Sequence, residues 1–433
     1  MYTDLSINDK MMNSECTPIV EVGAGAVNRI GGLLADIGAR SVFMYADRNT
    51  YAAAGELVED ALDAAGIVTK KYVFTSDKVE PNEASVGLAI MNFDPSVDAI
   101  VGVGSGVIND ISKIVANISG KKYIIVATAP SMDGYASATS SMSVSGLKVS
   151  LASRCADIII GDTDILRKAP MKMMLSGLGD MLAKYVAICE WRISNIINGE
   201  PVSIEVAGMV RSSLKECVEN ADGLLRRETA ATEAVFRGLV LCGLAMKLAG
   251  TSRPASGIEH YLSHIWDMRG EEFCTVTDLH GIQCAVGTYI AVGIYEKIKA
   301  VTPEREKAIE YVGAFDYSVW QERLKKFLGK GADAMIALEA REGKYDKERH
   351  KVRIERIIEK WAEILAVIDD ELPTMDSLTA LYKKVGMPMT MAEIEMDDSI
   401  LPMTFAAAKD IRDKYVLPRL CFDLGIIEEI KMG

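Results

Sequence analysis

Three of the four histidines in the chain lie between positions 260 and 280, which makes this segment the densest group of potential metal ligands. His260 and His264 are four residues apart in GIEHYLSHIWDM, and His280 follows in TDLHGIQCAVGT. Two imidazoles at this spacing share one face of a helix and can offer two nitrogens to one cation. The pattern therefore predicts a metal site. The remaining histidine, His350 in KERHKV, lies in a charged stretch and is expected to face solvent.

A divalent ion held by imidazoles also needs an anionic ligand, and Asp180 is the best candidate. It lies in SGLGDMLAKY, an otherwise apolar helical pattern in which an unpaired buried carboxylate would be costly. The alternative is an ion pair with Lys184, one helical turn later. Two imidazoles and one carboxylate are typical of catalytic zinc sites, and they also suit iron, nickel or manganese. We expect one divalent metal, with zinc as the first choice.

A glycine-rich turn, GVGSGVINDISK at 102–113, connects an apolar run to a helical pattern. Glycine lets backbone amides approach a pyrophosphate closely, and the N-terminus of the helix adds a favourable partial charge. Tight turns between strands and helices also carry glycine for steric reasons alone. The turn is therefore a candidate dinucleotide site that needs further support.

Two more segments add that support. Asp47 follows the apolar run SVFMY and could accept hydrogen bonds from the ribose hydroxyls of adenosine, although the neighbouring Arg48 could tolerate the 2′-phosphate of NADP. A solvated loop residue is the other interpretation of Asp47. The segment ATAPSMDGYASATSSM at 127–142 is a long hydroxyl-rich loop after the apolar run YIIVA, and Asp133 is its only carboxylate. Open α/β sheets bind ligands in such loops.

The elements that must position these residues differ between the two parts of the chain. From Pro18 to about Asp162, short runs rich in Val and Ile alternate with amphipathic stretches, which predicts βαβ units and a parallel sheet. After about Asp164, apolar residues recur every three to four positions, which predicts helices. The predicted strands are 41–45, 99–103, 123–127 and 157–160, and the predicted helices are 177–195, 203–220, 229–248, 282–299 and 354–369.

We therefore predict an α/β Rossmann-like N-terminal domain with a parallel sheet, followed by an all-α C-terminal domain. Residues 1–165 would bind the dinucleotide, and residues 166–433 would bind metal and substrate. Two domains also suit a chain of 433 residues.

Composition excludes some classes of partner and compartment. A net charge of −13 argues against nucleic acid, which requires clustered Lys and Arg. The N-terminus lacks the pattern of a signal peptide, and no uninterrupted run of eighteen apolar residues occurs, so we expect a cytoplasmic protein without a membrane span. The eight cysteines contain no CxxC pair and are expected to be free thiols.

The motifs GVGSGVINDISK, TAPSMDGYAS, GLGDMLAKY, EHYLSH and LHG, in this order, resemble sn-glycerol-1-phosphate dehydrogenase. That family belongs to the group formed by glycerol dehydrogenase, iron-type alcohol dehydrogenases and dehydroquinate synthase. The resemblance spans roughly Pro18 to Thr288. It implies a dehydroquinate synthase-like fold with metal in a cleft, and reversible NAD(P)H-linked reduction of dihydroxyacetone phosphate to sn-glycerol 1-phosphate. A role in phospholipid biosynthesis and a homo-oligomer are also expected.

The resemblance also implies a role for individual residues. Asp180, His260 and His280 would bind the metal. Asp133 and His264 would be catalytic, and both would contact the substrate together with Asp180. The residues implied to contact NAD or NADP are Asp47, Gly104, Ser105, Gly106, Val107, Ile108, Thr128, Ala129, Pro130, Ser131 and Ser137.

Hydride transfer to a ketone leaves negative charge on the carbonyl oxygen, which a bound metal stabilises as a Lewis acid. A hydroxyl or water relay with His264 or Asp133 would supply the proton. The substrate phosphate would need a basic group, for which the candidates near the motifs are Lys148, Arg154 and Arg253.

Three other interpretations stay open. They are a glycerol dehydrogenase acting on the free polyol, a dehydroquinate-synthase-type lyase that recycles its NAD, and a regulator without chemistry, which would require an incomplete metal set. The charged stretch 339–351 is expected to be an exposed helix or loop.

Overall fold

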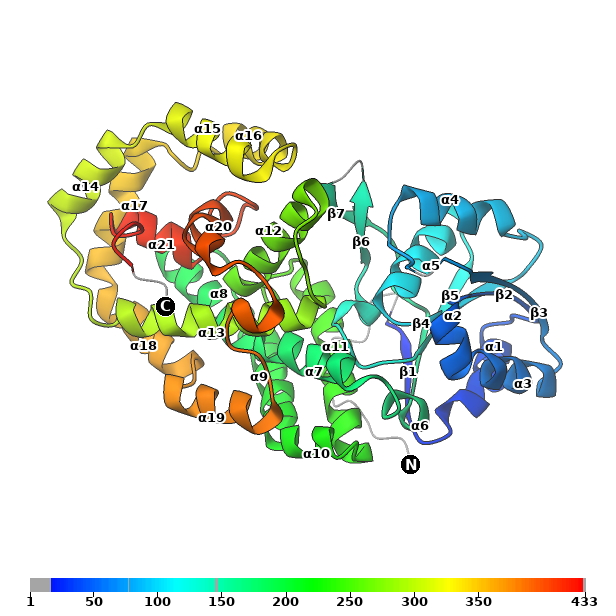
Figure 1. Cartoon of the computed structure of the whole chain (residues 1–433). Coiled ribbons are helices and arrows are strands. Elements are labelled where there is room, and N and C mark those ends of the chain that lie inside the picture. The colour runs from blue at the N-terminus through cyan, green and yellow to red at the C-terminus, as the bar shows by residue number, and fades with distance from the viewer. Residues whose placement is uncertain (1–16, 77, 145–146, 431–433) are drawn as a thin grey trace. The chain divides into compact units, whose positions relative to one another are not determined.

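The computed structural model describes residues 17–76, 78–144 and 147–430, and these form two compact units (Figure 1). The first unit holds the described residues up to Val144 together with Val149–Gly177 and Glu219–Thr251. The second consists mainly of Leu178–Val218 and the chain from Ser252 onward. The functional division into residues 1–165 and 166–433 stays a prediction.

The first unit is built on a six-stranded sheet in the order β1-β8-β5-β4-β2-β3, in which every neighbouring pair is parallel. A separate pair is formed by β6 (Thr139–Val144) and β7 (Leu147–Ala152). All four predicted strands lie in the six-stranded sheet. Its strands β1 and β3 were not predicted. The strands of the large sheet are β1 (Ile19–Gly23), β2 (Ser41–Asp47), β3 (Val68–Phe74), β4 (Ala99–Gly104), β5 (Lys122–Ala127) and β8 (Ile158–Asp162).

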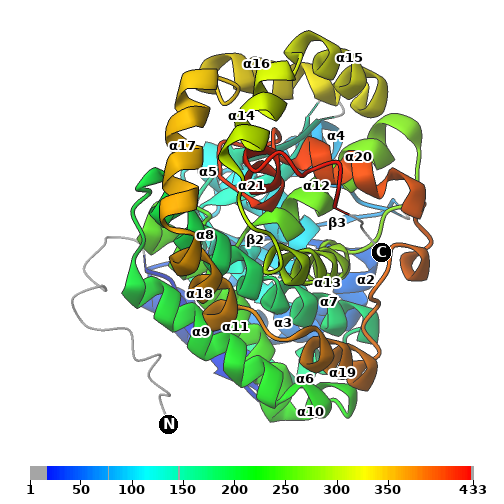
Figure 2. The ribbon, with the colours of Figure 1, turned by 90° about the vertical axis from the view of Figure 1, so that its left-hand side faces the viewer.

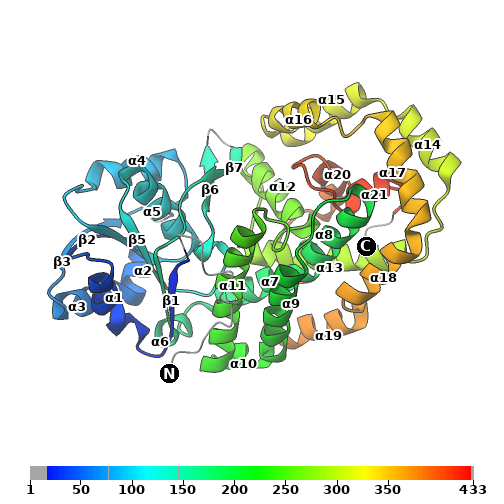
Figure 3. The same cartoon turned by 180° about the vertical axis from the view of Figure 1, so that it is seen from behind.

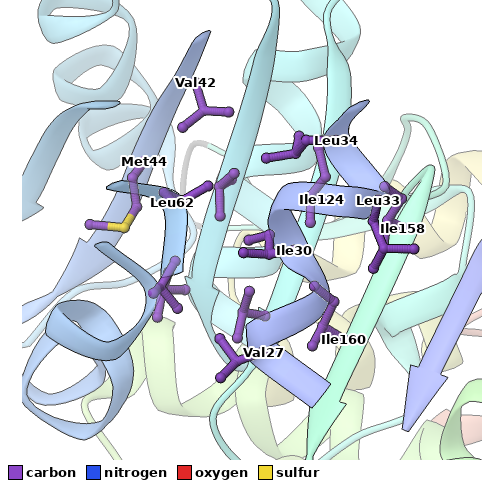
Figure 4. Packing of buried hydrophobic residues seen from close by; sticks show 14 of the residues in the cluster. Val27, Ile30, Leu33, Leu34, Val42, Met44, Leu62, Ile124, Ile158 and Ile160 are labelled. Carbon is purple, nitrogen blue, oxygen red and sulfur yellow. The ribbon is translucent and has the colours of Figure 1, made fainter. Parts of the chain in front are cut away.

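Apolar side chains cover both faces of this sheet. On β2, Val42 and Met44 belong to one buried cluster (Figure 4), whereas Phe43 and Tyr45 belong to the other. Successive side chains of a strand point to opposite faces, so a strand buried on both sides needs a continuous apolar run. The helices of this unit are α1 (Ile30–Asp36), α2 (Arg48–Thr50), α3 (Glu56–Ala64), α4 (Glu83–Asn92), α5 (Gly106–Ser119), α6 (Thr163–Leu166), the first part of α7 (Met171–Leu182), α10 (Ala221–Leu225) and α11 (Thr229–Ala249).

Among the described residues, α11 is the one helix long and apolar enough to cross a membrane, with a mean hydropathy of 1.3 over its best window. However, 67% of that window is buried inside the protein. Phe236 and Val240 of α11 belong to the second buried cluster of the sheet. The helix therefore fits the role of a core helix.

The second unit is built of helices, with α14 to α18 arranged around α21 (Figure 2 and Figure 3). Together with the parallel sheet, it confirms the predicted fold class. Its helices are the end of α7, α8 (Lys184–Asn198), α9 (Ile204–Glu219), α12 (Ile258–Phe273), α13 (His280–Ile298), α14 (Arg305–Ala314), α15 (Tyr317–Leu328), α16 (Gly331–Glu342), α17 (Lys347–Glu359), α18 (Trp361–Glu371), α19 (Met375–Val385), α20 (Leu401–Ala408) and α21 (Leu417–Asp423).

Two of the predicted helices are each divided in the structure. The segment 177–195 is interrupted at Ala183, between α7 and α8, and the segment 354–369 at Lys360, between α17 and α18. Lys360 has φ −104° and ψ 13°, outside the helical range. Apolar spacing continues across both interruptions, so the pattern alone could not reveal them.

The expectation that the charged stretch 339–351 is exposed is wrong in part. Glu339 and His350 are buried, and Nε2 of His350 lies 2.9 Å from the carbonyl oxygen of Asp423. His350 shares the buried face of α17 with Ile354 and Ile357. Because this face has helical spacing, a histidine within a charged sequence can still point into the core.

A buried carboxylate, Glu190 on α8, holds the starts of two other helices. Its Oε1 accepts a hydrogen bond from the backbone N–H of Leu417 at 2.7 Å, and its Oε2 accepts one from the N–H of Ile258 at 2.9 Å. Burial, followed by the nearby carboxylate of Glu259, raises the pKa of Glu190 to about 8. The folded protein therefore favours the neutral form of this side chain.

This raised pKa predicts a pH-dependent stability. Between the ordinary pKa of 4.5 and about 8, the unfolded chain releases a proton that the folded chain keeps. The Glu190 contribution should therefore be fully present below pH 4.5 and fall as the pH rises, by at most about 1.4 kcal/mol per pH unit. Urea unfolding should show a smaller slope with pH for Glu190→Gln than for wild type. The exposed control Glu205→Gln should keep the wild-type slope, and identical slopes for all three proteins would contradict the prediction.

Candidate functional site

The three predicted dinucleotide segments meet at one edge of the sheet in the first unit. Because β2, β4 and β5 are parallel neighbours, Asp47, Gly104 and Ala127 end adjacent strands, and Gly104 pairs with Ala127. Ser105 caps α5, and its Oγ lies 2.7 Å from Oγ of Ser131 in the hydroxyl-rich loop. The carboxyl edge of these strands is where open α/β sheets bind ligands.

Close packing at this edge explains part of the glycine pattern. A Cβ at Gly104 would lie 2.6 Å from Cβ of Ile108, so the steric interpretation applies to this glycine. A Cβ at Gly177 would lie 1.8 Å from the carbonyl oxygen of Pro130, and Ser176 Oγ donates to the Ser131 carbonyl at 3.0 Å. Gly177 thus lets α7 support the loop that follows β5.

Asp47 has a local structural role. Its Oδ1 accepts a hydrogen bond from the N–H of Thr50 at 2.8 Å, and its own N–H donates to Thr50 Oγ1 at 3.0 Å. These bonds form a capping box at the start of α2. The cap fixes the backbone of Asp47 at the end of β2. A contact with the ribose stays a prediction.

The loop after β5 is held by a buried cation that sequence reasoning did not single out, although it ends the glycine-rich motif. Lys113 is fully buried, and its Nζ donates to the carbonyls of Gly134 and Thr139 and to Oγ of Ser137. Burial lowers the pKa of Lys113. Asp133 lies at the start of the 3-10 turn Gly134–Ala136 in the same loop.

In the second unit, the structure brings the three predicted metal ligands together. Asp180 on α7, His260 on α12, and His280 and Cys284 on α13 each offer one ligand atom, and these four atoms lie within 4.8 Å of one another. The distance from His260 Nε2 to Asp180 Oδ1 is 3.5 Å. Sequence reasoning missed Cys284, although HGIQC places it one helical turn after His280. One carboxylate, two imidazoles and a sulfur fit a divalent transition metal.

Both imidazoles are oriented through their other ring nitrogen. Nδ1 of His260 lies 2.8 Å from Glu259 Oε1, and Nδ1 of His280 lies 3.1 Å from Ser263 Oγ. Gln283 donates to Ser263 Oγ at 3.2 Å and fixes the position of that hydroxyl. Partners of this kind are typical of metal-binding histidines, because they hold the ring and its tautomer in place.

The alternative interpretation of Asp180, an ion pair with Lys184, is also present. Lys184 Nζ lies 3.0 Å from Asp180 Oδ1 and donates to the carbonyl of Ala255 at 3.0 Å. Burial alone would raise the pKa of Asp180. The interactions with Lys184 and His260 lower this pKa by a larger amount, so the net pKa is well below its usual range. The carboxylate is therefore ionised. Burial lowers the pKa of His280, whereas Cys284 raises it, to about 9 overall.

His264 lies beside the four ligand atoms without belonging to that group. It is one turn after His260 on α12, and its ring centroid is 6.4 Å from that of His260 and 5.9 Å from that of His280. Its proposed role in proton transfer stays a prediction.

The basic candidates for the substrate phosphate have other partners. Arg154 contacts Asp157 at 3.0 Å, and Arg253 is buried in an ion pair with Glu200 at 2.6 Å. The side chain of Lys148 lies outside the described residues.

Two glycines allow the helices that carry the ligands to approach one another. A Cβ at Gly179 would lie 2.3 Å from the carbonyl oxygen of Gly281 and 2.9 Å from Cβ of Ala285. A Cβ at Gly287 would lie 2.8 Å from the carbonyl oxygen of Glu259. Thus α7 and α12 each contact α13 at a position without a side chain, next to a ligand.

We expect Gly179→Ala to weaken metal binding, because the added methyl group must push α7 away from α13 beside Asp180. Overpacking of this kind costs about 1–3 kcal/mol of stability. Metal content after dialysis against a limiting chelator, measured with urea unfolding, checks this. The control Gly208→Ala, where a Cβ meets nothing within 4 Å, should keep the wild-type metal content. Full metal content in Gly179→Ala would contradict the prediction.

The chain is also similar to known proteins. A family model described as iron-containing alcohol dehydrogenase matches residues 21–170. The chain is 28% identical over 401 residues to glycerol-1-phosphate dehydrogenase [NAD(P)+] of Halalkalibacterium halodurans, covering 92% of this chain and 90% of that relative. It is 33% identical to the Bacillus velezensis enzyme of the same name, covering 61% and 69%.

Among solved structures, glycerol dehydrogenase from Schizosaccharomyces pombe is similar with a TM-score of 0.63, at 17% identity, over 96% of this chain and 90% of that one. At this identity the similarity concerns the fold, and it supports the predicted two-part architecture. The sequence relationship extends further, and the chain belongs to the glycerol-1-phosphate dehydrogenase family, as its motifs predicted.

Proposed function

We propose that this chain catalyses the reversible NAD(P)H-linked reduction of dihydroxyacetone phosphate to sn-glycerol 1-phosphate, with one divalent metal held by Asp180, His260 and His280. The observation that supports it best is the convergence of these three side chains from three helices. The choice of reaction is supported by the relatives, which are named glycerol-1-phosphate dehydrogenase [NAD(P)+]. We expect zinc as the physiological ion, and a homo-oligomer that works in the cytoplasm on a small polyol phosphate.

The metal, when bound, supplies a Lewis acid for the negative charge that develops on the ketone oxygen during hydride transfer. The chain's own residues prepare this position. Asp180 is fully buried and ionised, and Glu259 and Ser263 orient the two imidazoles. Little rearrangement of these side chains is then needed, which favours both binding and catalysis.

In the first unit, the backbone amides at the start of α5 would bind the pyrophosphate of the dinucleotide. This helix has 14 residues, and its N-terminus follows directly from Gly104 and Ser105. The partial positive charge and unpaired amides of a helix start favour a phosphate group. Asp47 would contact the ribose, and Thr128 to Ser131 and Ser137 of the hydroxyl-rich loop would contact the cofactor.

His264 and Asp133 would move the proton that the alkoxide product needs. The imidazole of His264 can donate or accept a proton at its ring nitrogens, which suits a general acid. Asp133 belongs to the dinucleotide-binding unit, in the loop held by Lys113. Each would act directly or through a water molecule.

We expect the purified protein to oxidise NADH with dihydroxyacetone phosphate far faster than with dihydroxyacetone. Loss of charge-assisted hydrogen bonds to a phosphate costs about 3 kcal/mol, or about 10²-fold in kcat/KM. Chelation should abolish the activity, and zinc, nickel, iron or manganese added back separately should identify the ion. Preference for unphosphorylated glycerol in the reverse reaction would indicate a glycerol dehydrogenase. Turnover of the dehydroquinate synthase substrate without net change in NADH would indicate the lyase.

Replacing His264 tests the proton-transfer role separately. His264→Ala should lower kcat by about 10²-fold or more, because it removes a general acid. Its metal content should stay at the wild-type level, since His264 lies outside the group of four ligand atoms. His264→Gln, which retains hydrogen bonding but cannot titrate, should be equally slow. Unchanged turnover at all pH values would exclude the role.

A further inference from the structure

We propose that the sulfur of Cys284 is a fourth protein ligand of the metal, and that it makes the site selective for ions that bind thiolates, such as zinc, over manganese. The inference rests on the proposed function for the presence of a metal. It goes beyond that function because it assigns a ligand outside the carboxylate and imidazole set.

The position of Cys284 favours this role over simple packing. It follows His280 by one turn on α13, its side chain is fully buried, and its Sγ lies 3.5 Å from His280 Nε2. It is one of the four side chains whose ligand atoms lie within 4.8 Å of one another. A residue that only filled space in the core would not need to direct its sulfur at an imidazole nitrogen.

Two of the distances between donor atoms match the edges of a tetrahedral site, and all four atoms lie within 4.8 Å of one another. With bond lengths of about 2.0–2.1 Å to nitrogen and oxygen and about 2.3 Å to sulfur, the edges of a tetrahedron are about 3.4 Å for N···O and about 3.5 Å for N···S. The observed distances are 3.5 Å from His260 Nε2 to Asp180 Oδ1 and 3.5 Å from His280 Nε2 to Cys284 Sγ. Two separate edges, on ligands from three helices, thus have the length that one shared ion requires.

Charge balance points the same way. Asp180 already pairs with Lys184, so this carboxylate alone would offset little of the charge of a divalent ion. A thiolate at Cys284 would add a second negative charge beside the ion, and an uncompensated charge in a buried site is costly. Thiolate ligands favour zinc and related ions, whereas manganese and magnesium prefer oxygen. Four protein ligands still permit catalysis, because zinc in enzymes can become five-coordinate.

Cobalt substitution tests the assignment directly. Co²⁺ bound to a thiolate gives a sulfur-to-cobalt charge-transfer absorption that carboxylate and imidazole ligands do not give. The wild-type protein loaded with Co²⁺ should show this band, Cys284→Ser should lose it, and the control Cys189→Ser should keep it. Cys189 is an equally buried cysteine, on α8. Absence of the band in the loaded wild type, or its persistence in Cys284→Ser, would overturn the proposal without requiring the variant to be active.

Competition between ions gives a second readout. Cys284→Ser should bind Zn²⁺ at least about tenfold more weakly, while its affinity for Mn²⁺ changes little. Equal losses for both ions would overturn the claim of selectivity. Activity on dihydroxyacetone phosphate is measured on the same samples. Activity without the band refutes the cysteine ligand and leaves the function, whereas the band without activity refutes the function and leaves the ligand.

Discussion

The arrangement of the helical unit depends on one ionised carboxylate that has no access to water. Asp180 is fully buried on α7, and a negative charge in such a place is tolerated only when cations surround it. Lys184 from α8 and His260 from α12 both contact its Oδ1. The requirement to neutralise this charge explains why residues far apart in the sequence converge here, and why the same point suits a metal.

Other residues help to bring the side chains around Asp180 together. Glycines at 179 and 287 remove the side chains that would separate α7 and α12 from α13. Glu190 holds the first residue of α12 through the N–H of Ile258, two positions before His260. In the other unit, a buried positive charge has the corresponding role. Lys113 holds the hydroxyl-rich loop by donating hydrogen bonds to its carbonyl oxygens. In each unit, one buried charge therefore determines the local shape of a predicted site.

The sequence predicted the parts of this structure that follow from simple periodicity or rare residue types. Strands β2, β4, β5 and β8 were recognisable because a sheet covered on both faces requires uninterrupted apolar runs. The candidate ligands Asp180, His260 and His280 were recognisable because histidines are scarce in this chain and a carboxylate in an apolar helix needs a partner. The remaining features depend on tertiary context.

Two of those features show why. In the sequence, Cys284 could not be distinguished from the other cysteines expected to be buried. The fold places its sulfur beside His280, and only the spacing of four residues between them could have indicated this. His350 looked solvated because its neighbours are charged, yet the buried face of α17 selects every third or fourth residue regardless of them. The helix interruptions at Ala183 and Lys360 were missed for a similar reason, because the apolar spacing continues across them.

The ion pair between Lys184 and Asp180 bears on how stable the protein would be without the proposed metal. Since the ammonium group of Lys184 pairs with the carboxylate, loss of the proposed metal would leave Asp180 with a buried counter-ion. We therefore expect the metal-free protein to keep its fold and to bind the ion again, so a shortage of the ion would lower the activity without unfolding the protein.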